Sequence, residues 1–333
     1  MRINSAKGFT LLELLVAATI TLILAGLMLA VVTNTVNLWQ RNQTRFTGSA
    51  QASLALEMIG RDLQGAIYRA DDGTWLAVDV TNNAAALLPH GWLTSTSMKP
   101  ATGESSRLVP EVDAGTAPSI GNARFGLSGC WLRFVTTNVE SGGTLPVAVS
   151  YQIARRPVSG TIAAGNPAEI RYTLFRSAVS TATTFSTGYD LTAAGYGSAS
   201  ATPAASRNPK TLMNPNTADA LATNVVDFGV WFYGRDEATG ALRRIFPSDN
   251  TDLAHAAHTV PVVSDENRFP EVADVMVRIL SERGAGLLDE MEKSGGHLSR
   301  PAKYTSDAEW WWGVVETHST VYIRRIELRG GAG

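Results

Sequence analysis

The chain has a single cysteine, Cys130, among its 333 residues. One thiol cannot close an intramolecular disulfide, so a small disulfide-stapled secreted scaffold is excluded. Cys130 lies in the apolar, strand-like stretch GCWLRFV. We therefore expect it to be buried as a small hydrophobic residue.

An excess of charge of either sign is also absent. The chain has 28 Lys and Arg residues against 30 Asp and Glu residues, a net charge of −2, and its basic residues are scattered. A protein that binds nucleic acid through its phosphates needs a concentrated basic surface. We predict no nucleic-acid partner from this composition.

The common sequence signatures of catalysis are missing. The chain has no phosphate-binding G-x-x-x-x-G-K-[ST], no strand-linked G-x-G-x-x-G, no G-x-S-x-G and no H-E-x-x-H. The stretch GLSGC at 126–130 is not a nucleophile elbow, because its second glycine comes one residue early. We expect a protein that is not an enzyme and that has no cofactor of its own.

Two short stretches hold potential metal ligands. His255 and His258 in HAAH would share one face of a helix, and Asp249 and Asp252 lie just before them in SDNTD. Neither stretch has a third ligand at a fixed spacing or the spacing of an EF-hand. A solvated loop for the histidines and an exposed turn for the acids are the favoured interpretations.

The main positive feature is a long apolar run near the start. No charged residue occurs between Leu14 and Gln40, and a membrane-spanning helix needs about 20 apolar residues. We predict a transmembrane helix over residues 9–33. The flanking basic residues are nearly balanced and do not orient the helix; they are Arg2, Lys7, Arg41 and Arg45.

Two simpler explanations of this run fit less well. A secretory signal peptide has a shorter apolar run with a small-residue cleavage site after it, whereas here the polar leader MRINSAKG stops at Gly8, before the run. A plain single-pass anchor leaves Glu13 unexplained, and a carboxylate in the bilayer costs about 2.5–3.5 kcal/mol on insertion scales.

The junction KGFTLLE, residues 7–13, resembles the leader of type IV pilins and of type II secretion pseudopilins. The resemblance implies that a prepilin peptidase cuts between Gly8 and Phe9, after the basic Lys7, and methylates the new terminus on Phe9. The methyl donor, S-adenosylmethionine, is used by the peptidase and is not bound by this chain. The resemblance also implies that Glu13 pairs with the terminal amine of a neighbouring subunit and sets axial register during fibre assembly.

Beyond the membrane segment, residues 34–70 are amphipathic. No proline occurs between Phe9 and Arg69, so we predict that one helix runs through both segments. The apolar positions follow helical spacing; they are Trp39, Phe46, Ala52, Leu56, Ile59, Leu63 and Ala66.

Residues 71–333 have mainly the two-residue periodicity of strands. The predicted strands are 130–137, 145–155, 169–177, 225–233, 271–281 and 319–328. A short helix is predicted at 286–293, and long surface loops are predicted at 97–122 and 178–222. The predicted class is α+β, in which a long transmembrane-to-amphipathic helix packs on a mostly antiparallel β domain, the lollipop shape of pilins.

The order of these elements resembles minor pseudopilin J of type II secretion systems, and minor pilin W of type IV pili is similar. Compared with that pattern, the chain has insertions around 97–122, 178–222 and 284–312. The resemblance implies a structural subunit at or near the tip of a pseudopilus. It would be anchored in the bacterial inner membrane with a cytoplasmic amino terminus and a periplasmic domain. Its partners would be prepilin peptidase, other minor and major pseudopilins and the inner-membrane assembly platform.

Two other functions stay open from the sequence. One is a minor pilin of a type IV pilus or DNA-uptake system, and the other is a membrane-anchored glycan-binding module or enzyme. Three successive indoles in EWWWG, Trp310, Trp311 and Trp312, cannot all enter one core from a strand. We expect either an anchor at a strand edge or in a loop, or a contact with a partner.

Overall fold

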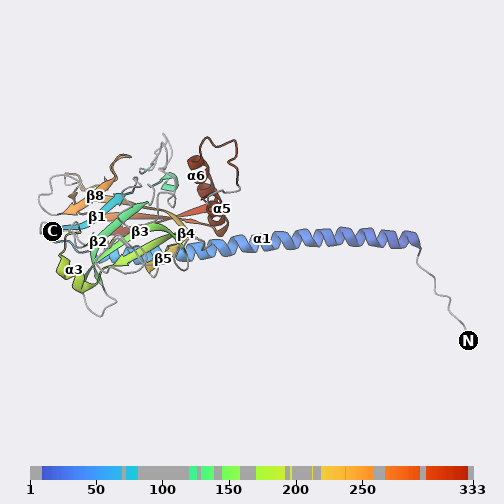
Figure 1. Ribbon diagram of the computed structural model, residues 1–333, viewed down its shortest axis with the longest axis horizontal. Coiled ribbons are helices and arrows are strands. Elements are labelled where there is room, and N and C mark those ends of the chain that lie inside the picture. The colour runs from blue at the N-terminus through green and yellow to red at the C-terminus, as the bar shows by residue number, and fades with distance from the viewer. Residues whose placement is uncertain are drawn as a thin grey trace, which may run out of the picture. The chain divides into compact units, whose positions relative to one another are not determined.

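A computed structural model (Figure 1) gives the fold in two compact units, Met1–Thr47 and Gly48–Gly333. It describes residues 10–69, 73–81, 108, 120–125, 129–138, 145–157, 170–191, 196, 212, 219–236, 238–258, 267–292 and 298–328.

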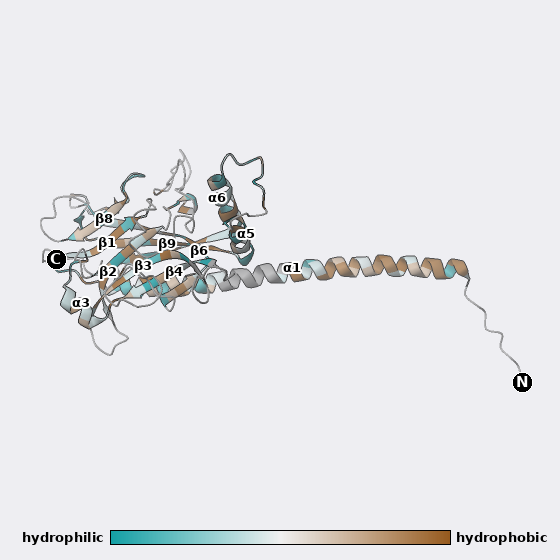
Figure 2. Cartoon of the chain, in the orientation of Figure 1, coloured by the Kyte–Doolittle hydropathy of each residue, from teal (hydrophilic) through white to brown (hydrophobic). Residues whose placement is uncertain are grey.

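The first helix, α1, runs from Leu11 to Gln64. Its segment Leu11–Val36 is long and apolar enough to cross a membrane, and every side chain in it is exposed. Figure 2 shows this segment as predominantly hydrophobic. An apolar helix that is exposed on all sides is stable only in an apolar environment, such as the interior of a membrane. The structure therefore agrees with the predicted membrane helix.

The second unit contains the last part of α1, from Gly48. One side of this part is buried and the other, including Ser53, Glu57 and Arg61, is exposed, as the amphipathic pattern predicts. The buried apolar side chains are Ala52, Ala55, Leu56, Ile59 and Leu63.

The helix ends at Gln64, before the predicted residue 70. Gly65 follows, and a Cβ at this position would lie 2.9 Å from the Thr136 hydroxyl. The chain can therefore approach a strand closely, and Ala66 forms an isolated β-bridge with Thr136. Pairing with the sheet replaces helical hydrogen bonds from this point.

Two antiparallel sheets form the β structure. The six-stranded sheet has the order β5-β4-β3-β2-β1-β8, with strands β1 (Thr74–Val80), β2 (Cys130–Asn138), β3 (Leu145–Pro157), β4 (Ile170–Ala178), β5 (Ala220–Thr223) and β8 (Ala254–His258). The four-stranded sheet has the order β10-β9-β6-β7, with strands β6 (Val225–Arg235), β7 (Leu242–Phe246), β9 (Val272–Leu280) and β10 (Ser319–Glu327).

All six predicted strands are confirmed, and the α+β class with them. The main core joins buried residues of α1 with residues of both sheets, for example Ile59, Phe134 and Val277. In β9 every residue is buried, although the sequence suggests one buried face. The second face of this sheet is covered in part by residues 120–125, and Phe125 packs against Gly229 and Trp231.

The prediction of a surface loop at 178–222 is wrong for the residues described. Helix α3 (Thr181–Thr187) lies there, and Val179, Leu191, Tyr196 and Leu212 are buried in a second core with Trp75. Apolar side chains spaced far apart in a Gly/Ser/Thr-rich stretch cover this face of the six-stranded sheet. Most of the predicted loop 97–122 lies outside the described residues, which include Leu108 and the 3-10 turn η3 (Ile120–Asn122).

Two helices lie between β9 and β10. Helix α5 (Glu282–Glu292) corresponds to the helix predicted at 286–293 and begins four residues earlier. Helix α6 (Asp307–His318) was not predicted. It begins at the N-cap Ser306, whose side chain accepts a hydrogen bond from the Glu309 N–H, the arrangement that favours helix initiation.

Candidate functional site

The predicted processing residues precede the described part of the chain. Lys7, Gly8 and Phe9 lie outside the described residues, and Thr10 is the first residue that the structure describes.

Thr10 and Glu13 form a capping box at the start of α1. The Thr10 N–H and hydroxyl both donate to Glu13 Oε2 at 3.0 Å, and the Glu13 N–H donates to the Thr10 hydroxyl at 3.2 Å. This reciprocal pairing satisfies backbone N–H groups that a helix start otherwise leaves open. The signature T-x-x-E before an apolar run is visible in the sequence and could have predicted this capping box.

The capping box gives the carboxylate a partner within its own chain. Only Oε2 of Glu13 takes part in these bonds, so Oε1 is not used by the capping box. The Glu13 side chain is exposed, and so are the neighbouring Leu11 and Leu12, at 85% and 74%. Glu13 therefore lies at an exposed, apolar end of the helix, where a charged or polar partner from another molecule can reach it.

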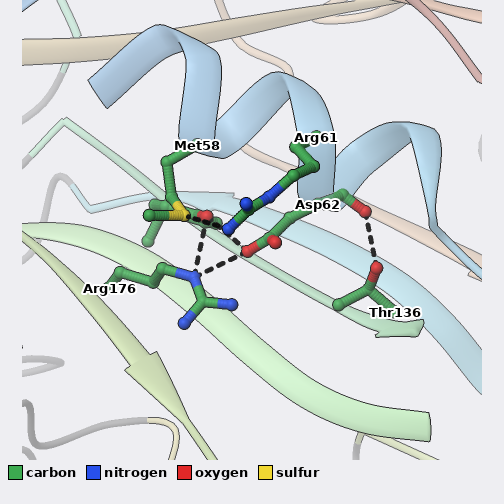
Figure 3. Close-up of polar contacts among 6 residues, drawn as sticks. Met58, Arg61, Asp62, Thr136 and Arg176 are labelled. Carbon is green, nitrogen blue, oxygen red and sulfur yellow. Dashed lines mark hydrogen bonds and ion pairs between the residues drawn. The ribbon is translucent and has the colours of Figure 1, made fainter. Parts of the chain in front are cut away.

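A second polar site lies in the last turn of α1 (Figure 3). Asp62 is 5% exposed and accepts hydrogen bonds from the Tyr151 hydroxyl at 2.5 Å and from Arg176 Nε at 2.7 Å. The backbone carbonyl of Asp62 accepts a bond from the Thr136 hydroxyl at 2.7 Å. These partners come from β2, β3 and β4, three adjacent strands of one sheet, and burial raises the pKa of Tyr151 well above its usual value. The sequence alone does not reveal this site, because Asp62 appears there as one polar residue of an amphipathic helix.

The tryptophans of EWWWG lie on α6, so the prediction of a strand-edge or loop anchor is wrong. Trp311 and Trp312 are each 2% exposed and pack edge-to-face with ring centroids 5.0 Å apart. In a helix, successive residues point in directions about 100° apart, so two neighbouring indoles can enter one core. Trp310 is partly exposed, so of the three it alone keeps a surface for a partner.

Glu292, the last residue of α5, connects α6 to the six-stranded sheet. Its carboxylate accepts from Trp311 Nε1 at 2.8 Å and from the Tyr172 hydroxyl at 2.6 Å, and it forms an ion pair with Arg155 at 2.6 Å. Burial raises the pKa of Glu292, although these three partners oppose the rise.

The potential metal ligands do not form a metal site in the described part of the chain. His255 and His258 lie on β8, not on a helix or in a solvated loop, and the buried His255 has Nε2 2.9 Å from the Arg268 carbonyl. Asp249 accepts from the Thr251 N–H and hydroxyl at 2.7 Å in an exposed turn, and Asp252 accepts from the Ser248 N–H. No group of three His, Cys, Asp or Glu side chains that suits a metal occurs among the described residues. Cys130 is fully buried, as predicted.

Comparison with known proteins finds one match. Residues 3–29 match the model of the prokaryotic N-terminal methylation motif. No curated protein and no solved structure matches the chain. The matched segment includes Gly8, Phe9 and the Thr10–Glu13 capping box, and it supports a type IV pilin-like protein that is processed by a prepilin peptidase.

Proposed function

We propose that the chain is a structural, non-catalytic subunit of a pilin-like filament, a minor pseudopilin at or near the tip of a type II secretion pseudopilus. The observation that carries this proposal is the position of Glu13. It lies at the start of an exposed 26-residue apolar segment, within a methylation motif over residues 3–29. The order of strands that resembles minor pseudopilin J supports the finer assignment.

The geometry suggests how processing prepares Glu13 for assembly. Cleavage between Gly8 and Phe9 removes the basic Arg2 and Lys7 and creates a charged amine on Phe9, next to Thr10. Thr10 holds Glu13 Oε2, which leaves Oε1 for the terminal amine of a neighbouring subunit. A carboxylate in lipid is stabilised by such a cationic partner, so the pairing would favour subunits at one axial offset.

The first test is the state of the amino terminus. Intact-mass and N-terminal analysis of the protein purified from bacterial membranes should show a chain that begins at N-methylated Phe9. A chain that begins at Met1, or one that begins after Val32, would contradict the proposal. Gly8→Asp is expected to leave the leader attached and to block assembly.

The second test concerns Glu13 directly. Glu13→Ala should stay in the membrane and be processed, yet enter filaments poorly, because the charge pair is lost. Glu57→Ala is the matched control, since Glu57 is an exposed glutamate further along the same helix. Equal filament incorporation of wild type and Glu13→Ala would refute the proposed role.

The machine and its other subunits can be identified by crosslinking in cells. A photoreactive residue placed at Ser53 or Leu54, on the exposed side of α1, should capture other pseudopilins and the assembly platform. Capture of pilus subunits instead would assign the chain to a type IV pilus or a DNA-uptake system. In the proposed orientation these sites face the periplasm. Labelling reagents confined to the cytoplasm should therefore leave them unmodified, which tests that orientation.

A further inference from the structure

The apolar side of α1 fixes which face packs on the sheets and also contributes to its axial position through side-chain size. A shift of one helical turn toward the amino end places Ile59 where Ala55 packs and Leu63 where Ile59 packs. Both of these positions remain apolar after the shift, but Gly60 takes the place of the buried Leu56. Larger side chains in the alanine positions cause packing strain, which changes an equilibrium by about 5- to 150-fold, and a cavity at the position of Leu56 changes it by about 30- to 4,000-fold.

The polar contacts of Asp62 add a separate and comparably strong preference for the observed axial position. Of the charged α1 side chains whose burial the structure describes, Asp62 alone is buried. The same one-turn shift places Ala66 at the position of Asp62 and leaves Tyr151 and Arg176 without the carboxylate that they bind; Figure 3 shows Arg176 beside Asp62. Breaking a buried ion pair on one side changes an equilibrium by about 150- to 4,000-fold.

The segment after the helix adds a steric preference at Gly65. The Ile67 N–H donates to the Val135 carbonyl, and the Thr137 N–H donates to the Gly65 carbonyl. These backbone bonds can form again after a shift, but Arg69 would then take the place of Gly65, where a Cβ would lie 2.9 Å from the Thr136 hydroxyl. Among the α1 side chains whose burial the structure describes, the carboxylate of Asp62 is the single one on the buried side.

We propose that Asp62 is a positioning residue that sets the axial register of α1 on the two sheets. A buried polar residue has this registry role in coiled coils, where it lowers stability and selects one alignment. The inference concerns the second unit and does not depend on the proposed function. In a filament subunit, the consequence is that a pull along the helix would not slide it past its sheets.

Two pairs of introduced cysteines can report the register in the full-length protein in detergent micelles. Gly60→Cys with Arg324→Cys reports the observed register, because a Cβ on Gly60 would lie 3.3 Å from Cζ of Arg324. Gln64→Cys with Arg324→Cys reports the register shifted by one turn, which brings residue 64 to the position of residue 60. Cys130→Ala removes the native thiol, and a short, irreversible bifunctional thiol reagent traps each register.

The decisive variant is Asp62→Leu/Arg176→Leu/Tyr151→Phe, which removes the polar cluster without leaving a buried charge unpaired. It should fold, since apolar replacements of buried ion pairs are often tolerated. In this background we expect crosslinking of the shifted pair to be at least about tenfold faster than in the wild-type background, with the observed-register pair still reactive. Asp62→Asn should give a smaller increase, and the exposed Glu57→Gln should give none.

Two results would overturn the proposal. One is a folded triple variant in which the shifted pair reacts as slowly as in wild type, since the cluster would then affect stability alone. The other is a triple variant that does not fold, since the proposal requires that apolar packing supports the unit without the cluster. Neither result depends on whether the protein enters a filament.

Discussion

At the scale of single residues, the three adjacent tryptophans of α6 have different environments. Trp311→Ala and Trp312→Ala should each lower the free energy of unfolding by about 3–5 kcal/mol, the usual cost of removing a buried aromatic side chain. Trp310→Ala should cost much less, because this side chain is partly exposed. Urea unfolding of the three variants gives the comparison, and equal losses would contradict the assigned burial.

Gly229 has a similarly specific role. A Cβ at this position would lie 2.0 Å from Cε2 of Phe125, so Gly229→Ala should lower the free energy of unfolding by about 1–3 kcal/mol through overpacking. In the double variant with Phe125→Ala the added methyl group meets no ring. The two costs should therefore sum to more than the cost of the double variant, and strict additivity in urea unfolding would show that the two residues do not interact.

At the scale of elements, the strands with clear alternation were predictable and the elements defined by tertiary contacts were not. In β6 the alternating residues Val226, Phe228, Val230 and Phe232 predict a strand with one apolar face, whereas the short β8 has the sequence AHAAH and no comparable pattern. The stretch EWWWG by itself suggests a strand or a loop, whereas the S-x-x-E signature of Ser306 and Glu309 marks the start of helix α6.

The candidate sites divide in the same way. Gly8, Phe9 and Glu13 can be identified from local sequence alone, because all three lie within residues 3–29, which match the methylation motif. The Asp62 site combines residues from four elements, so no local pattern reveals it. Burial of Trp311 and Trp312 also depends on contacts with other elements, such as the bond from Trp311 to Glu292.

The stability that the packing of α5 and α6 on the six-stranded sheet provides should depend on pH, because Glu292 connects these elements. Burial raises the pKa of Glu292 above its ordinary value of 4.5. The folded state therefore binds the proton more tightly than the unfolded state, and this contribution to stability is lost as the pH rises through the raised pKa. Relative to Glu292→Gln, the wild type should lose stability as the pH rises from about 4.5 toward neutrality, measured by urea unfolding at several pH values. A relative gain over this range would contradict the direction of the shift.

At the scale of the whole molecule, the chain divides between Thr47 and Gly48, so we predict that the second unit folds in isolation. A fragment of residues 48–333 keeps the buried stripe of α1 and both sheets, so it should be soluble and should unfold cooperatively without detergent. The control is a fragment that begins at Gly65 and lacks the stripe, which should aggregate. Equal solubility of the two fragments would show that α1 is not part of the core.

The burial of β9 has a consequence for hydrogen exchange of its backbone amides. Every residue of β9 is buried, and the strand is paired on both sides, by β6 and by β10. Amide protons exchange with solvent only when their hydrogen bonds open, and the best-protected elements open with the free energy of global unfolding. The amides of β9 should therefore be the last to take up deuterium, so their rate measures the stability of the whole second unit.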